Sequence, residues 1–167
     1  MAGAALSWFP MAVKAEQAQA RVSGVSVKPA LEVLLLYEDL GTALRAKYSL
    51  DRMLLQLGAE VKMSTRLWRL DLLSQPLLAE QAAIEASAAD LIVLSLHSHR
   101  QLRAEVRDWL NRWLDHKADR PCVLAALLDT ELTQPSSRHP VLAYLRRAAE
   151  TAGADLFCGS CQVPRRR

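Results

Sequence analysis

Glycine, cysteine and long apolar runs are all scarce in this chain of 167 residues. The six glycines form neither a Gly-x-Gly-x-x-Gly motif nor a P-loop, so a dinucleotide-binding loop is not expected. A flavodoxin-type protein needs a Ser/Thr-rich loop after the first strand to bind the phosphate of the flavin. Here Glu38 and Asp39 follow the first apolar run, and their carboxylates would repel that phosphate. No apolar run approaches the ~20 residues of a membrane helix, so no membrane association is expected.

The cysteine content and the amino-terminal sequence both favour a cytoplasmic location. Three cysteines make no disulfide framework, and an odd number is typical of a reducing compartment. The first residues are apolar, but no lysine or arginine precedes them and Pro10 interrupts them, unlike a secretory signal.

The net charge of +3 arises at the two ends of the chain. Arg165, Arg166 and Arg167 form a basic tail, and residues 1–30 carry a further +2. Residues 31–164 hold 15 basic and 17 acidic side chains, a net charge of −2. A nucleic-acid-binding body needs a basic excess, so no nucleic-acid partner is expected. We divide the chain into an appendage (1–30), a folded domain (31–161) and a basic tail (162–167).

Apolar runs of strand length alternate with helical periodicity through the folded domain. The pattern predicts strands over 31–37, 60–64, 90–96, 122–128 and 154–158. It predicts helices over 42–57, 74–88, 102–117 and 139–153, with Ser74 capping the second and Gly153 ending the last. Trp109 and Trp113 fall on the apolar stripe of the third helix, which favours a core position.

Strict alternation predicts a three-layer α/β/α fold. We expect a five-stranded parallel sheet in the order 2-1-3-4-5. Too few residues follow the fifth strand for a last helix, so apolar surface over strands four and five would stay uncovered. We expect that surface to be covered by the segment Leu6–Val13, with Trp8, Phe9 and Met11, or by a partner subunit.

Three strand regions resemble those of response-regulator receiver domains, which have a flavodoxin-like fold. Val33–Asp39, Asp90–Leu96 and Gly153–Phe157 resemble the first, third and fifth strands, and the resemblance covers roughly residues 31–160. The chain is also similar to bacterial proteins that share the Tyr-Glu-Asp opening and have no known activity.

Position by position, the resemblance implies a degenerate phosphorylation site. Ser95 stands where receivers have the phosphoryl-accepting aspartate, Ala126 where they have a hydroxyl residue, and Ser160 where they have a lysine. Only the metal-binding acidic pair, Glu38 and Asp39, is retained. With neither nucleophile nor lysine, aspartyl-phosphate chemistry is not expected.

Polar residues gather at the predicted carboxyl ends of the strands, where α/β folds bind ligands. Carboxylates of strands one and four and two histidines after strand three could ligate a divalent metal; these candidates are Glu38, Asp39, His97, His99 and Asp129. The competing interpretation is a set of ordinary polar loop residues.

Two further motifs carry weaker signals. Ser95 lacks the flanking glycines of a hydrolase nucleophile elbow, and Cys158-Gly-Ser-Cys161 is not followed by the helix that activates a redox cysteine. Trp68 lies in a stretch of mixed apolar and arginine side chains (65–73), which suggests an exposed interaction surface.

Two functions remain open. The leading hypothesis is a non-catalytic, receiver-like regulatory module that acts through protein contacts, as a homodimer or with another partner, and needs no cofactor. The alternative is a small enzyme that depends on a metal or ligand bound at the carboxyl ends of strands one, three and four.

Overall fold

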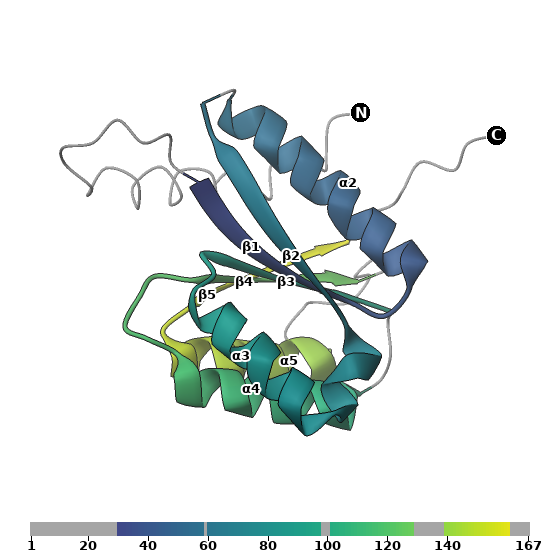
Figure 1. Cartoon of the computed structure of the whole chain (residues 1–167). Coiled ribbons are helices and arrows are strands. Elements are labelled where there is room, and N and C mark those ends of the chain that lie inside the picture. The colour runs from purple at the N-terminus through teal and green to yellow at the C-terminus, as the bar shows by residue number, and fades with distance from the viewer. Residues whose placement is uncertain (1–29, 59, 98–100, 129–138, 161–167) are drawn as a thin grey trace.

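The computed structural model describes residues 30–58, 60–97, 101–128 and 139–160. The appendage up to residue 29 and the tail lie outside these residues. Figure 1 shows one sheet between helical layers. The elements in chain order are β1 (Ala30–Tyr37), α2 (Leu40–Leu57), β2 (Lys62–Arg69), η2 (Leu70–Ser74), α3 (Pro76–Ser87), β3 (Leu91–Leu96), α4 (Ala104–His116), β4 (Val123–Leu128), α5 (Pro140–Ala152) and β5 (Asp155–Ser160).

All four strand pairs are parallel, and the strand order is β2-β1-β3-β4-β5. This confirms the predicted α/β fold class and strand order, and the arrangement is compatible with a flavodoxin-like fold. All six residues of β3 are buried, as expected for a central parallel strand covered on both sides.

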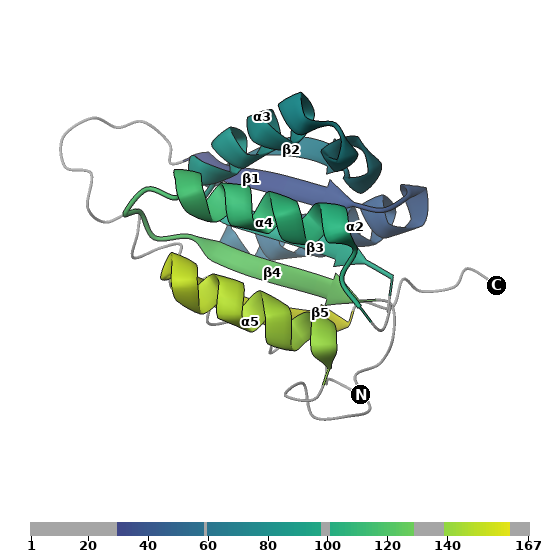
Figure 2. The same ribbon diagram turned by 90° about the horizontal axis from the view of Figure 1, so that it is seen from below.

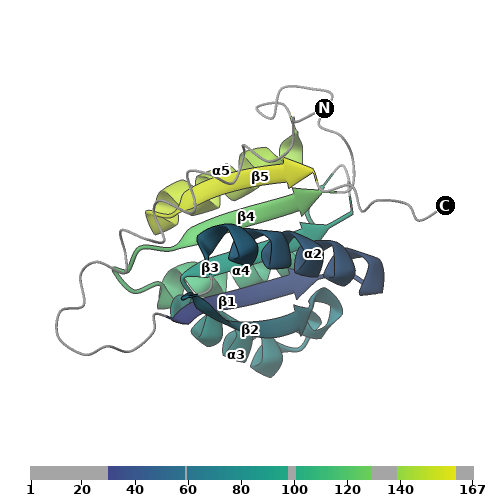
Figure 3. The same ribbon diagram turned by 90° about the horizontal axis from the view of Figure 1, so that it is seen from above.

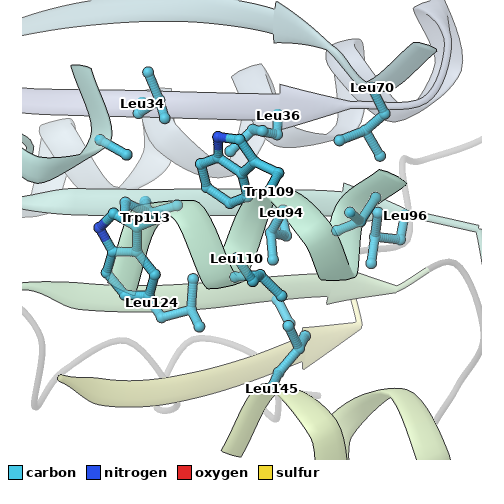
Figure 4. Packing of buried hydrophobic residues seen from close by; sticks show 14 of the residues in the cluster. Leu34, Leu36, Leu70, Leu94, Leu96, Trp109, Leu110, Trp113, Leu124 and Leu145 are labelled. Carbon is cyan, nitrogen blue, oxygen red and sulfur yellow. The ribbon is translucent and has the colours of Figure 1, made fainter. Parts of the chain in front are cut away.

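Three helices, α3, α4 and α5, cover one face of the sheet (Figure 2). The core under them centres on Trp109 and Trp113, whose rings stack with centroids 6.4 Å apart. Both indoles are fully buried against leucines of β1, β3 and β4 (Figure 4), which confirms their predicted core position.

Of the helices in the described residues, α2 is the one that covers the opposite face (Figure 3). Ala46, Leu50 and Met53 of α2 pack in one apolar cluster with side chains of β1, β3 and β4. Among the described residues, no helix follows β5 and none covers β5 on this side. The predicted lack of a last helix is therefore confirmed.

Two local predictions were wrong around β2. The strand continues to Arg69 instead of ending at 64, because all eight residues of β1 pair with it, from Ala30–Lys62 to Tyr37–Arg69. Ser74 does not cap α3. Its hydroxyl donates to the carbonyl of Asp71 at 2.7 Å, and α3 begins at Pro76 without a side-chain cap.

Gly153 ends α5 as predicted, with φ of 62° in the left-handed region. None of the described helices combines the length and apolarity needed to cross a bilayer.

Candidate functional site

The acidic pair after β1 begins α2. The Asp39 carboxylate accepts a hydrogen bond from the Thr42 amide at 2.9 Å. The Thr42 hydroxyl in turn accepts from the amides of Glu38 and Asp39 at 3.0 and 2.9 Å. This reciprocal capping box satisfies amides that the first helical turn leaves without partners.

The same two carboxylates hold the residue that follows β3. Glu38 Oε2 accepts from the His97 amide at 2.7 Å, and Asp39 Oδ2 lies 2.8 Å from His97 Nε2. The Thr42 amide, together with His97, lowers the pKa of Asp39 from 3.8 to about 2. The side chains of Glu38 and Asp39 thereby join the carboxyl ends of β1 and β3.

A shallow hollow beside this cluster is open to solvent. Its volume is about 210 Å³, solvent-open space included, and its lining residues are Glu38, Leu96, His97, Gln101, Leu102, Arg103, Val106 and Val141. The lining combines a basic and an acidic side chain, Arg103 and Glu38, with the apolar side chains of Leu102, Val106 and Val141. Most of that volume is open solvent, and the enclosed part has room for about one water molecule rather than for a ligand.

The predicted metal site is described only in part. Glu38, Asp39 and His97 meet in pairs, whereas His99 and Asp129 lie outside the described residues. No three His, Cys, Asp or Glu side chains converge on a cation position within the described ranges. Asp39 lies beside the His97 imidazole, whereas the Glu38 carboxylate accepts from the His97 backbone amide.

Ser95, at the degenerate acceptor position, is fully buried and lies between α2 and β4. Its hydroxyl donates to the carbonyl of Thr42 at 2.7 Å. It also lies 3.3 Å from Nη2 of Arg45, which donates to the carbonyls of Leu96 at 2.7 Å and Leu127 at 3.3 Å. A buried guanidinium therefore fixes the ends of β3 and β4 at this position.

Sequence reasoning missed Arg45. A usable signal was present, because Arg45 falls on the same helical face as the buried Thr42, Ala46 and Met53. A charged residue within such a stripe needs polar partners inside the fold, and the ends of neighbouring strands supply carbonyls.

The other two degenerate positions differ in placement. Ala126 pairs with Leu94 and lies in the cluster under α3–α5, so it does not share the face of Ser95. Leu127 is the residue of β4 that pairs with Ser95, because the register sets these two opposite each other. Ser160 is the last residue of β5 and pairs with Leu128.

The expectation of an exposed Trp68 is wrong. Its side chain is 8% exposed and packs in the main core, and its indole nitrogen donates to Glu85 at 2.8 Å. Trp68 lies near the end of β2 on the face that α3 covers, which buries it. Trp8 and Phe9, the other predicted interaction residues, lie outside the described residues.

The cysteines are poorly suited to redox chemistry as far as the structure describes them. Burial raises the pKa of Cys122 to about 11 and also raises the pKa of Cys158. A reactive cysteine requires a lowered pKa. Cys161 lies outside the described residues.

An exposed apolar surface is a second feature that sequence reasoning missed. Leu40, Leu44, Tyr48 and Leu55 of α2 remain exposed, with Leu40 at 73% and Leu55 at 83%. They lie on the side of α2 away from the sheet, and we name them the α2 outer face. Their spacing is helical, so the sequence held this signal alongside that of the buried face.

The chain matches no protein-family model, and it matches no curated protein at a significant level.

Proposed function

We propose that this chain is a non-catalytic, receiver-like regulatory module that does not accept a phosphoryl group and that acts through protein contacts of α2. The α2 outer face is the observation that carries the proposal. Four large apolar side chains on one helix are more than scattered surface residues, and such patches are typical of protein interfaces.

The surroundings of Ser95 support the absence of phosphoryl transfer. A phosphoryl acceptor must meet its donor at the surface, whereas Ser95 is buried and its hydroxyl is held by Thr42 and Arg45. Under this proposal, the chain keeps a receiver-like fold that is not switched by phosphorylation.

A second copy of the chain is the partner we propose for the α2 outer face. Asp51 lies within this face, three residues after Tyr48, and forms an ion pair with Lys47 one helical turn before it. This side of α2 therefore carries both charges. A two-fold axis near Tyr48 would set two copies of α2 antiparallel, with Leu40 of each copy near the far end of the other helix. Lys47 of one copy would then approach Asp51 of the other.

The mass of the protein in solution tests this proposal. The double variant Leu44→Glu/Leu55→Glu places like charges in the apolar contact, and light scattering should show a fall from dimer to monomer mass. The matched control is Leu77→Glu/Ile84→Glu on the exposed side of α3, which should leave the dimer mass unchanged. A wild-type protein that is monomeric at all concentrations would contradict the proposal.

Incubation with acetyl phosphate tests whether the chain accepts a phosphoryl group. Mass spectrometry after incubation should show no phosphoryl adduct on the wild-type chain. A phosphoryl adduct on Ser95, Glu38 or Asp39 would contradict the proposal that the chain does not accept a phosphoryl group.

The contacts among Glu38, Asp39 and His97 favour one alternative, a small enzyme dependent on a metal or ligand. Under this alternative, Mg²⁺, Mn²⁺ or Zn²⁺ would raise the thermal unfolding midpoint of the wild type but not of Glu38→Ala or His97→Ala. Under our proposal these ions leave all three midpoints unchanged.

A further inference from the structure

β2 is an edge strand whose outer side is unpaired in the described part of the chain. It is the last strand of the sheet, beside β1, and Figure 3 shows no described strand on its other side. Apart from the pairing with β1, residues 63–67 make no backbone hydrogen bond within the described ranges. An edge strand directs amides and carbonyls away from the sheet, and an extended segment can bind to these groups.

The middle of β2 is accessible from both faces of the sheet. Ser64, Thr65, Arg66 and Leu67 are four consecutive exposed residues, and Leu67 is 61% exposed. Since side chains of a strand alternate between the two faces, neither α2 nor α3 covers this stretch. A strand added here would meet open backbone, polar side chains and one apolar side chain that it could bury.

The charge of β2 indicates what kind of segment would bind. The strand carries three basic side chains and no acidic one. Arg69 is paired with Asp71 at 2.6 Å. Lys62 and Arg66 are exposed, and neither forms an ion pair with another described residue. Two positive charges on the free edge are therefore available to carboxylates from outside.

Two acidic residues lie near Arg66 without neutralising it. Arg66, Glu32 and Glu85 line a recess of about 290 Å³, solvent-open space included. Glu85 instead accepts from the Trp68 indole at 2.8 Å and from the Gln81 amide at 3.2 Å. The Arg66 guanidinium thus keeps its capacity for a carboxylate partner.

The same charges disfavour a second copy of β2 as the occupant. Two paired copies would bring together strands that carry only basic charges. Like charges on opposite strands destabilise a sheet, whereas opposite charges stabilise it. The edge therefore selects against itself and in favour of an acidic strand.

We propose that β2 binds an extended acidic segment of another protein by strand addition. Lys62 and Arg66 lie four residues apart on one side of the strand, whereas Leu67 lies on the other. The matching segment has two acidic residues four positions apart, and an apolar residue follows or precedes the acid that meets Arg66. Main-chain hydrogen bonds supply affinity, and these side chains supply selectivity.

A synthetic peptide tests the proposal on the full-length protein. The fluorescein-labelled sequence Ile-Glu-Thr-Val-Thr-Glu-Ile has its glutamates four positions apart and reads the same in both directions, so it can match β2 in either orientation. Fluorescence anisotropy should show saturable binding to the wild type that weakens with added salt. The peptide with lysine in place of both glutamates should not bind.

Charge reversal on β2 tests which residues select the peptide. Lys62→Glu/Arg66→Glu should weaken binding of the glutamate peptide by about tenfold or more, because two attractive cross-strand pairs become repulsive. The lysine peptide should bind this variant instead. Arg107→Glu/Arg147→Glu is the matched control, since it changes the net charge equally at exposed positions of α4 and α5. It should leave binding of the glutamate peptide unchanged.

Hydrogen exchange followed by mass spectrometry locates the bound peptide without any substitution. Saturation with the glutamate peptide should slow amide exchange in residues 62–69 and leave α4 and α5 unchanged. The site is separate from the α2 outer face, so Leu44→Glu/Leu55→Glu should bind the peptide like the wild type. Failure of the α2 dimer and failure of the β2 site are therefore distinguishable.

Four results would overturn the proposal. They are no binding of the glutamate peptide to the wild type at millimolar concentration, equal affinities of the glutamate and lysine peptides, slowed exchange outside β2 only, and equal losses of affinity in the two charge-reversal variants. In the first case the basic side chains of β2 serve only to keep copies of the edge apart.

Discussion

Asp39 connects two parts of the molecule through one carboxylate. One oxygen caps α2 at the Thr42 amide, and the other lies 2.8 Å from His97 at the end of β3. The first contact is local in sequence, whereas the second spans 58 residues. A substitution here should therefore weaken a helix start and a tertiary contact together.

We predict that the stability contributed by the Asp39 charge depends on pH. Because the pKa of Asp39 in the folded state, about 2, lies below the ordinary value of 3.8, its ionised form stabilises the fold above about pH 4. This contribution declines as the pH falls towards 2. Asp39→Asn can still cap α2 but carries no charge, so urea unfolding should show a stability gap from wild type at pH 7 that closes near pH 2.

Asp39→Ala separates the cap from the charge. It removes both, and an N-cap substitution typically costs about 1 kcal/mol, so its deficit should persist at pH 2. A gap between wild type and Asp39→Asn that stays constant with pH would contradict the prediction.

Single residues also show where sequence reasoning reaches its limit. Glu38, Asp39 and His97 were predicted to meet because parallel strands end at one edge. Arg45 was missed and Trp68 was wrongly expected to be exposed, since each depends on partners far along the chain. These partners are Leu96 and Leu127 for Arg45, and Glu85 of α3 for Trp68. No local pattern encodes those contacts.

A glycine with positive φ follows the last residue of both α2 and α5, whereas the glycine at the start of α2 does not need that conformation. Gly153 has φ of 62°, a conformation that side-chain-bearing residues adopt at a cost, while Gly41 in the first turn of α2 has no positive φ. A Cβ added at Gly41 would meet Asp39 Oδ1 at 3.4 Å, an ordinary contact.

We therefore predict opposite effects for the same substitution in the two helices. Gly153→Ala should destabilise the protein by about 1 kcal/mol, whereas Gly41→Ala should be neutral or stabilising by up to about 1 kcal/mol. Equilibrium urea unfolding measures both. Equal losses for the two variants would show that the backbone conformation at Gly153 is not what matters.

Element types were predictable because most of the strands and helices carry a clear apolar run or stripe, but element boundaries were less predictable. The second strand was predicted as five residues and has eight. Its burial pattern is mostly exposed, so no apolar run marks its end. Pairing with β1 sets its length instead.

At the scale of the whole molecule, the sheet is unevenly protected. β3 and β4 lie inside it and are buried almost throughout, whereas most residues of the edge strand β2 are exposed. We predict that hydrogen exchange followed by mass spectrometry will show the slowest exchange in β3 and β4 and clearly faster exchange in β2. Uniform exchange across the sheet would contradict this prediction.

The fold class and strand order could be predicted because alternating strands and helices permit few parallel topologies. The lack of a helix after β5 within the described residues followed from the same count of elements. The α2 outer face was not predicted, because periodicity identifies a buried stripe more readily than a second, exposed one on the same helix.

The parallel direction of β1 and β5 has a practical consequence for protein engineering. All strands are parallel, so β1 starts at the amino ends of the strands and β5 finishes at their carboxyl ends. A reporter attached at the start of β1 and another attached at the end of β5 are therefore about 20 Å apart along the strand direction. A circular permutant that lacks the segments before β1 and after β5 would need a linker that bridges this gap. For a split reporter, the connections between strands are better cut sites than the ends of the sheet.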